Sequence, residues 1–193
     1  FWWSGKREGL PDIQFHFLAG AGVEAGIPDV PGGAGCTLNS YLVRPKSRGT
    51  VTLKSPNPKD HPVIDPNFLD HPDDLAGTVE SVRLGRHIMS QEALRPHVVR
   101  EHYPGAKIES QDELEDFVRS GARTGYHPSG TCRMGSDHRS VVDTQLRVRG
   151  IDGLRVTDAS IMPRLVSGNT NATTIMIAER AGEFISGNRR KNS

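Results

Sequence analysis

The sequence has few cysteines, almost no net charge and no long apolar run. Its two cysteines, Cys36 and Cys132, do not suggest a disulfide framework, which favours a reducing compartment such as the cytoplasm. The 24 basic and 23 acidic residues give a net charge of +1, so no large field attracts nucleic acid or an anionic membrane surface. No apolar run approaches the roughly 18 residues that a membrane-spanning helix needs. Nucleic-acid binding and membrane association are therefore not indicated.

The length of the chain and its first residues indicate how it is organised. A chain of 193 residues is of single-domain size and can bury a substantial core. It begins at Phe1 rather than at a methionine, and Trp2 and Trp3 follow at once. We therefore expect the sequence to be a piece of a longer protein, in which case a targeting signal could lie outside it.

The first half of the chain predicts strands followed by helices. Alternation predicts a strand at 12–19, and strands at 37–43 and 50–53 are expected to form a hairpin, with a short strand at 63–65. Pro72, followed by two acidic residues, predicts a helix at 72–90. A capping box at residues 110–113 predicts a shorter helix that ends at Gly121. This order predicts an α+β fold, with an antiparallel sheet flanked by helices.

Residues 20–25 match a dinucleotide-binding fingerprint in letters only. The run GAGVEA follows a predicted strand, as that motif requires. The helix that should come next would have to pass through Pro28 and Pro31 and several glycines, and no acidic residue stands about 20 positions on. We expect residues 20–35 to form a loop instead, one that could cover a substrate.

The C-terminal third predicts a strand and a helix with polar residues at their ends. Residues 154–158 alternate as a strand, which places Asp158 where the strand gives way to a loop. A helical pattern begins at Asn171, with Asn171 and Thr173 as candidate caps. Its expected apolar stripe consists of Ile175, Ala178, Gly182 and Ile185.

His127 is the candidate catalytic residue. Pro128 restricts His127 to an extended conformation and Gly130 favours a tight turn, so a stiff loop presents the imidazole. Histidine titrates near neutrality and can accept a proton. An amide such as Asn171, across the site, could hydrogen-bond the same oxygen without competing for that proton. Taken alone, a structural histidine that caps a loop is the alternative for His127, and a plain helix cap is the alternative for Asn171.

Two long blocks carry a resemblance to a known family. YHPSGTCRMG and VTDASIMPRLVSGNTNATTIMIAERA closely resemble the C-terminal signature of the glucose-methanol-choline (GMC) family of FAD-dependent alcohol oxidoreductases. The sequence of these blocks is most similar to that of the choline-dehydrogenase-like branch. The upstream run NSYLVRPKSRGTVTLKSPNPKDHPVIDPNFLDHPDD is also similar to that family, so the resemblance covers nearly the whole chain.

The resemblance implies a reaction, a cofactor and a set of site residues. His127 would be the base and Asn171 its partner during hydride transfer from a CH–OH group to flavin N5. Cofactor contacts would come from Asp158, Ala159, Asn171, Ala172 and Thr173. Residues 1–140 would belong to the substrate-binding domain, and residues 141–193 would return to the FAD-binding domain. The partners would be an alcohol substrate and an N-terminal FAD-binding region of the same protein.

Other functions remain as alternatives. His127, Cys132, Asp137 and His138 match no usual zinc spacing, so no metal site is predicted. Ser129 lacks the nucleophile elbow of a hydrolase. A folded but inert substrate-domain fragment is the serious rival, because the one dinucleotide fingerprint fails. Choline would need an aromatic or acidic cage, and only 6% of residues are aromatic, so neither the alcohol nor the electron acceptor can be read from the sequence.

Overall fold

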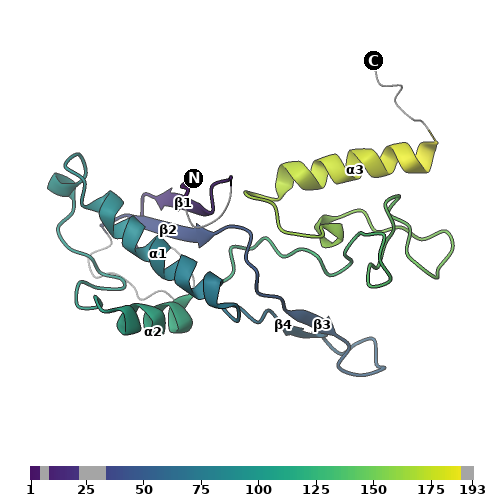
Figure 1. Ribbon diagram of the computed structural model, residues 1–193, viewed down its shortest axis with the longest axis horizontal. Helices are drawn as coiled ribbons and strands as arrows, with labels where there is room; N and C mark the ends of the chain where they lie inside the picture. The colour runs from purple at the N-terminus through teal and green to yellow at the C-terminus, as the bar shows by residue number, and fades with distance from the viewer. Residues whose placement is uncertain (5–8, 22–33, 188–193) are drawn as a thin grey trace, which may run out of the picture. The chain divides into compact units, whose positions relative to one another are not determined.

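A computed structural model of the chain describes residues 1–4, 9–21 and 34–187, and Figure 1 labels its helices and strands. The described elements are β1 (Ile13–Leu18), β2 (Thr37–Leu42), β3 (Thr50–Thr52), β4 (Val63–Asp65), α1 (Pro72–Met89), η1 (Arg95–His97), α2 (Gln111–Gly121), η2 (Ala159–Ile161) and α3 (Asn171–Ser186). Antiparallel strand pairs and separate helices confirm the predicted α+β class. Most of the loop predicted at 20–35 lies outside the described residues.

The chain divides into two compact units. The first contains Phe1–Gly49 and Pro66–Arg123, and the second contains Thr50–Asp65 and Thr124–Ser193. The expected domain boundary near residue 140 stays a prediction. In the part of the chain that the structure describes, no helix has both the length and the apolar character needed to span a bilayer.

The strands pair differently from the predicted hairpin. In the first unit β1 pairs antiparallel with β2, so that Ile13 lies opposite Leu42. In the second unit β3 pairs antiparallel with β4, with Thr50 opposite Asp65. The hairpin expected between 37–43 and 50–53 is therefore wrong. The strands β2 and β3 are near one another in sequence, but each forms its backbone hydrogen bonds with another strand.

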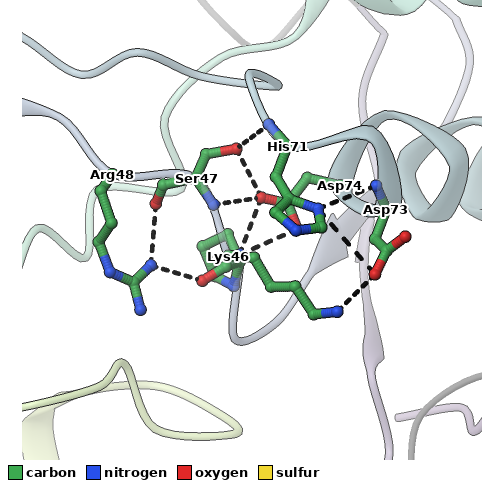
Figure 2. Close-up of polar contacts among 7 residues, drawn as sticks. Lys46, Ser47, Arg48, His71, Asp73 and Asp74 are labelled. Carbon is green, nitrogen blue, oxygen red and sulfur yellow. Dashed lines mark hydrogen bonds and ion pairs between the residues drawn. The ribbon is translucent and has the colours of Figure 1, made fainter.

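The connection after β2 is fixed by the first turn of α1, as Figure 2 shows. The buried Asp74 carboxylate accepts hydrogen bonds from the backbone N–H of Lys46 at 2.8 Å and of Ser47 at 2.7 Å, and from the Ser47 hydroxyl at 2.6 Å. That hydroxyl in turn accepts the backbone N–H of His71 at 3.0 Å. On the surface Lys46 pairs with Asp73. The turn is thus held by α1 rather than by a partner strand.

The predicted helices of the first unit are confirmed. Pro72 is the first residue of α1, and the His71 ring accepts the backbone N–H of Asp73 at 3.2 Å. Ser110 and Glu113 form the predicted capping box at the start of α2. The two helices pack through a buried cluster of Leu75, Val79, Leu114 and Val118. A fully buried side chain of this kind contributes about 1.5–3 kcal/mol relative to an exposed one.

The second unit contains few regular strands around its own core. Its buried cluster consists of Val142, Leu146, Ile161, Met162, Ile177 and Ala181. The strand expected at 154–158 is wrong, because these residues form one isolated bridge, Arg147 with Arg155, and no longer ladder. The chain then turns at Asp158, whose side chain accepts the backbone N–H of Ser160 at 2.8 Å and begins η2.

Helix α3 begins where the sequence predicts and buries a different face. The helix starts at Asn171, as expected, but the stripe that was to contain Ile175 and Ile185 is wrong, since these side chains are 55% and 67% exposed. Ile177 and Ala181 are buried instead, four residues apart on one face. Both stripes fit a helical period, so periodicity alone does not choose between them.

Candidate functional site

The loop that carries His127 runs beside η2 in the second unit. The backbone N–H groups of Cys132 and Met134 donate to the carbonyls of Ser160 at 2.9 Å and Ile161 at 2.8 Å. Gly130 has a φ of +88°, and a Cβ there would lie 3.3 Å from the Met162 carbonyl oxygen. A side chain at position 130 would therefore be both strained and crowded. The half-buried His127 stands at the start of this anchored loop.

Two neighbouring polar residues contact the His127 ring, one at each nitrogen. The Thr170 Oγ1 atom lies 2.9 Å from Nδ1, and the Asn169 Nδ2 atom lies 3.1 Å from Nε2. An amide nitrogen can only donate, so the Asn169 contact matches the tautomer in which Nε2 accepts and Nδ1–H donates to Thr170 Oγ1. In this tautomer the basic lone pair lies on Nε2.

Thr170 also stands at the N-cap of α3. Its carbonyl accepts the backbone N–H and the hydroxyl of Thr174, both at 2.9 Å. Its own hydroxyl makes no capping hydrogen bond to the first turn, because it contacts His127 instead. The first N–H groups of α3 are thus not covered by the side chain that usually caps them.

The other predicted site residues lie at the starts of α3 and η2. Asn171 and Ala172 are exposed in the first turn of α3, and Thr173 beside them is half-buried. The exposed Asp158 caps η2, and Ala159 is the first residue of that turn. The adjacent Ser160 side chain and the Ser160 backbone N–H, which donates to the carboxylate, hold the pKa of Asp158 below its ordinary value, so its carboxylate is charged at neutral pH.

The amide that reaches His127 belongs to Asn169 rather than to Asn171. Asn169 and Thr170 were not singled out in the sequence, although both lie in the same Ser-Gly-Asn-Thr-Asn run. Two asparagines separated by one residue cannot be told apart by their distance along the chain from His127. The backbone turn into α3 decides which one faces the ring.

Asp137, one of the residues weighed for a metal site, pairs with Arg133. The Arg133 guanidinium donates two hydrogen bonds to Asp137, at 2.8 Å and 2.9 Å. These bonds keep the pKa of Asp137 far below its ordinary value. Among the residues that the structure describes, no group of three or more histidine, cysteine, aspartate or glutamate side chains could hold a metal ion. The two cysteines are not joined in a disulfide.

Comparison with known proteins identifies the family. The family described as GMC oxidoreductase, in the profile of its C-terminal domain, matches residues 45–178. An alcohol dehydrogenase [acceptor] of Pseudomonas putida is 50% identical over 94% of this chain and 33% of its own length. The mitochondrial choline dehydrogenase of Homo sapiens is 48% identical over 92% of this chain and 30% of its own. The chain belongs to the GMC oxidoreductase family, in its choline-dehydrogenase-like branch, and spans about a third of these relatives.

Solved structures of the family share this fold. A pyridoxine 4-oxidase from Mesorbium loti superimposes with a TM-score of 0.86 at 33% identity, over 94% of this chain and 36% of that chain. A formate oxidase of Aspergillus oryzae, described in connection with modification of its FAD, gives 0.87 at 28% identity over 95% and 33%. The recognition made from the two sequence blocks is thereby confirmed.

Proposed function

We propose that this chain is the C-terminal substrate-binding and catalytic portion of an FAD-dependent alcohol oxidoreductase, with His127 as the base. The observation that supports the proposal is the placement of the His127 ring, with Thr170 Oγ1 2.9 Å from Nδ1 and Asn169 Nδ2 3.1 Å from Nε2. A neutral imidazole held in this way is suited to take a proton from an alcohol. Membership of an oxidoreductase family supplies the reaction class.

The chemistry divides between the protein and its cofactor. FAD, when bound, supplies the acceptor for the hydride that leaves the carbinol carbon. The hydroxyl proton passes to His127 Nε2 as the C–O bond becomes a carbonyl, so proton and hydride together account for the two hydrogens removed. Asn171 is the proposed donor to the same oxygen, which develops negative charge as the proton leaves. The two side chains thus act on one atom of the substrate.

The start of α3 fits a flavin ring. Its first N–H groups are not covered by the Thr170 hydroxyl, its first turn holds no acidic residue, and Ala172 is small and exposed. A helix N-terminus of this kind attracts an electron-rich oxygen. Asn171, Ala172 and Thr173 are therefore proposed to hold the cofactor from this side, with Asp158 and Ala159 as further contacts.

The nucleotide half of FAD needs a different element. A glycine-rich β-α-β unit binds it in most flavin enzymes, whereas both sheets in the described residues are antiparallel pairs. We propose that an N-terminal region of the same protein supplies this unit. The alternative is a chain that folds but is inert, and the visible spectrum of the purified protein, with or without flavin absorption, distinguishes the two.

The substrate is proposed to be an alcohol. The similar proteins are named for choline and alcohols, and one neighbour in structure is named for pyridoxine. The described part of this chain does not select among these. Assays with choline, a simple primary alcohol and an aromatic alcohol would rank them by the rate of anaerobic flavin reduction.

Replacing His127 tests the proposal. In the flavin-loaded enzyme that contains this chain, His127→Ala is expected to slow flavin reduction by substrate by at least about 10²-fold, because a positioned base contributes about 10²- to 10⁴-fold. Asn171→Ala is expected to cost less, and the double variant less than the product of the two losses, since both groups act on one oxygen. The measurement is the rate of anaerobic flavin reduction in stopped flow.

The matched control is His138→Ala, which removes an exposed histidine further along the same segment. This variant should reduce its flavin at the wild-type rate. An enzyme with His127→Ala that binds FAD and reduces it within about threefold of wild type would remove His127 as the base, since the expected loss is about 10²-fold.

A further inference from the structure

The Thr170 hydroxyl is the one contact that fixes His127 Nδ1 in the described structure, at 2.9 Å. A neutral imidazole has two tautomers, and the partner of one nitrogen determines which nitrogen carries the proton. An oxygen that accepts from Nδ1–H leaves the lone pair on Nε2. The donor position of the Asn169 amide at Nε2 agrees with this tautomer, because an amide nitrogen has no lone pair to offer.

Helix stability does not explain the placement of this hydroxyl. A threonine at an N-cap usually accepts a backbone N–H of the first turn and stabilises the helix by about 1 kcal/mol. The Thr170 hydroxyl makes no such bond, and the residue lies in the right-handed region at φ −80° and ψ −15° rather than in the extended conformation typical of a cap. Its side chain is therefore directed to the ring at the expense of the helix.

We propose that Thr170 is a positioning residue for the alcohol oxidation: it holds His127 in the Nδ1–H tautomer and turns Nε2 toward the substrate hydroxyl. The proposal rests on the proposed role of His127 as base. Thr170 itself touches neither substrate nor flavin in this scheme, and it acts through the ring alone. Asn169 occupies Nε2 in the resting site and gives way when the substrate hydroxyl takes that position.

Thr170 is also expected to set the pH at which His127 becomes a base. An acceptor at Nδ1–H stabilises the protonated ring more than the neutral ring, because a hydrogen bond from a charged donor is stronger. The two partners within hydrogen-bonding distance of the ring, Thr170 and Asn169, are uncharged. Titratable or charged groups on the neighbouring segments are Tyr126, Cys132, Arg133, Asp137, Asp158, Arg164, Glu179 and Arg180. These residues are the same in the wild type and in all variants below, so a difference between the pH profiles of the variants does not come from them.

The test compares Thr170→Val, Thr170→Ser and Thr174→Val in the flavin-loaded enzyme. Valine keeps the shape of threonine and lacks the hydroxyl, serine keeps the hydroxyl, and Thr174→Val removes a hydroxyl from α3 that bonds the Thr170 carbonyl. The rate of anaerobic flavin reduction is measured across pH, with flavin content and melting temperature for each variant. Thr170→Ala serves as a second variant without the hydroxyl if the valine enzyme does not fold.

Thr170→Val is expected to slow the plateau rate by about fivefold, the effect of one typical hydrogen bond. It should also shift the rise of the rate with pH to lower values, a change that a purely structural role would not produce. Thr170→Ser should restore both properties, and Thr174→Val should match wild type.

Three results would overturn the proposal. They are a valine enzyme with the wild-type rate and pH profile, a serine enzyme that resembles the valine enzyme, and a Thr174→Val enzyme with the same shift as Thr170→Val. Each counts against Thr170 alone when His127→Ala still shows its large loss. An unaltered rate in His127→Ala would instead remove the proposed base itself.

Discussion

Helices α2 and α3 begin in opposite ways. At α2 the Ser110 hydroxyl accepts the backbone N–H of Glu113 at 3.2 Å, and the Glu113 carboxylate accepts the backbone N–H of Ser110 at 2.9 Å. At α3 the Thr170 hydroxyl leaves the helix and contacts His127. The first arrangement satisfies backbone groups and stabilises a helix. The second leaves N–H groups available and orients a side chain, so it suits a site better than a scaffold.

Helix α1 resembles α2, because the polar contacts at its start also stabilise the fold. Its first turn contains two acidic residues, and one of them, Asp74, is 1% exposed and accepts hydrogen bonds from three groups in the turn after β2. The negative charge at the helix N-terminus is favourable, and the donors Lys46 and Ser47 belong to the same unit as α1. The polar contacts at the start of α1 therefore serve stability, whereas those at the start of α3 serve His127.

The largest effect on stability is expected from Asp74→Ala. The change removes the buried acceptor of the Lys46 and Ser47 backbone N–H groups and of the Ser47 hydroxyl, so it should lower the free energy of unfolding by about 3 kcal/mol. Urea unfolding followed by the fluorescence of Trp2 and Trp3, which belong to the same unit, measures the loss. Asp73→Ala is the matched control, because the Asp73 side chain is 56% exposed and an exposed ion pair contributes about 0–1 kcal/mol. Equal losses for the two variants would contradict a special role for Asp74.

The next largest effect is on helix stability, and it should differ between α2 and α3. Ser110→Ala removes half of the capping box and should destabilise α2 by about 1 kcal/mol, or about fivefold in local opening. Thr170→Val removes a hydroxyl that does not cap α3, so local opening of α3 should stay at its wild-type value. Native-state amide hydrogen exchange measures both helices. A loss of protection in α3 as large as that in α2 would show that Thr170 stabilises its helix after all.

Local signals explain why much of this fold could be predicted from the sequence. Pro72 and the Ser110–Glu113 pair define helix starts through groups a few residues apart, and α1 and α2 follow. Strand pairing is not local: β2 pairs with β1, and the turn that follows β2 is held by the distant Asp74 through Lys46 and Ser47. The same holds for the buried face of α3, where two helical stripes compete and the core selects Ile177 and Ala181.

The candidate site was predicted in part for the same reason. His127 is recognisable because Pro128 and Gly130 shape its loop locally. Its contacts are long-range, since Asn169 stands 42 residues away and Thr170 stands 43 residues away. Which member of Asn169, Thr170 and Asn171 faces the ring depends on the conformation of Thr170, which no pattern in the sequence reports. The role of Asn171 stays a prediction.

The smallest expected effect is a pH dependence of helix stability, which we expect for α2 but not for α3. Hydrogen bonds from the backbone N–H groups of Ser110 and Glu109, and from the Ser110 hydroxyl, lower the pKa of Glu113. A carboxyl with a lowered pKa in the folded state stabilises the fold at pH values above its unfolded pKa, about 4.3. That contribution is lost as the pH falls from there through the lower folded value. Protection of α2 should therefore decline in this window, while α3, with no acidic residue in its first turn, lacks this contribution.

Amide exchange of α2 at pH 6 and at pH 3, corrected for intrinsic rates, measures that decline. Glu113→Gln should reduce it, because glutamine still accepts a hydrogen bond but has no charge to lose. Asp116→Asn removes one acidic residue from the same helix outside the capping box and should leave the wild-type decline in place. A Glu113→Gln variant with the full decline would assign the pH dependence to other carboxyls of the first unit, and the capping box would then contribute through neutral hydrogen bonds alone.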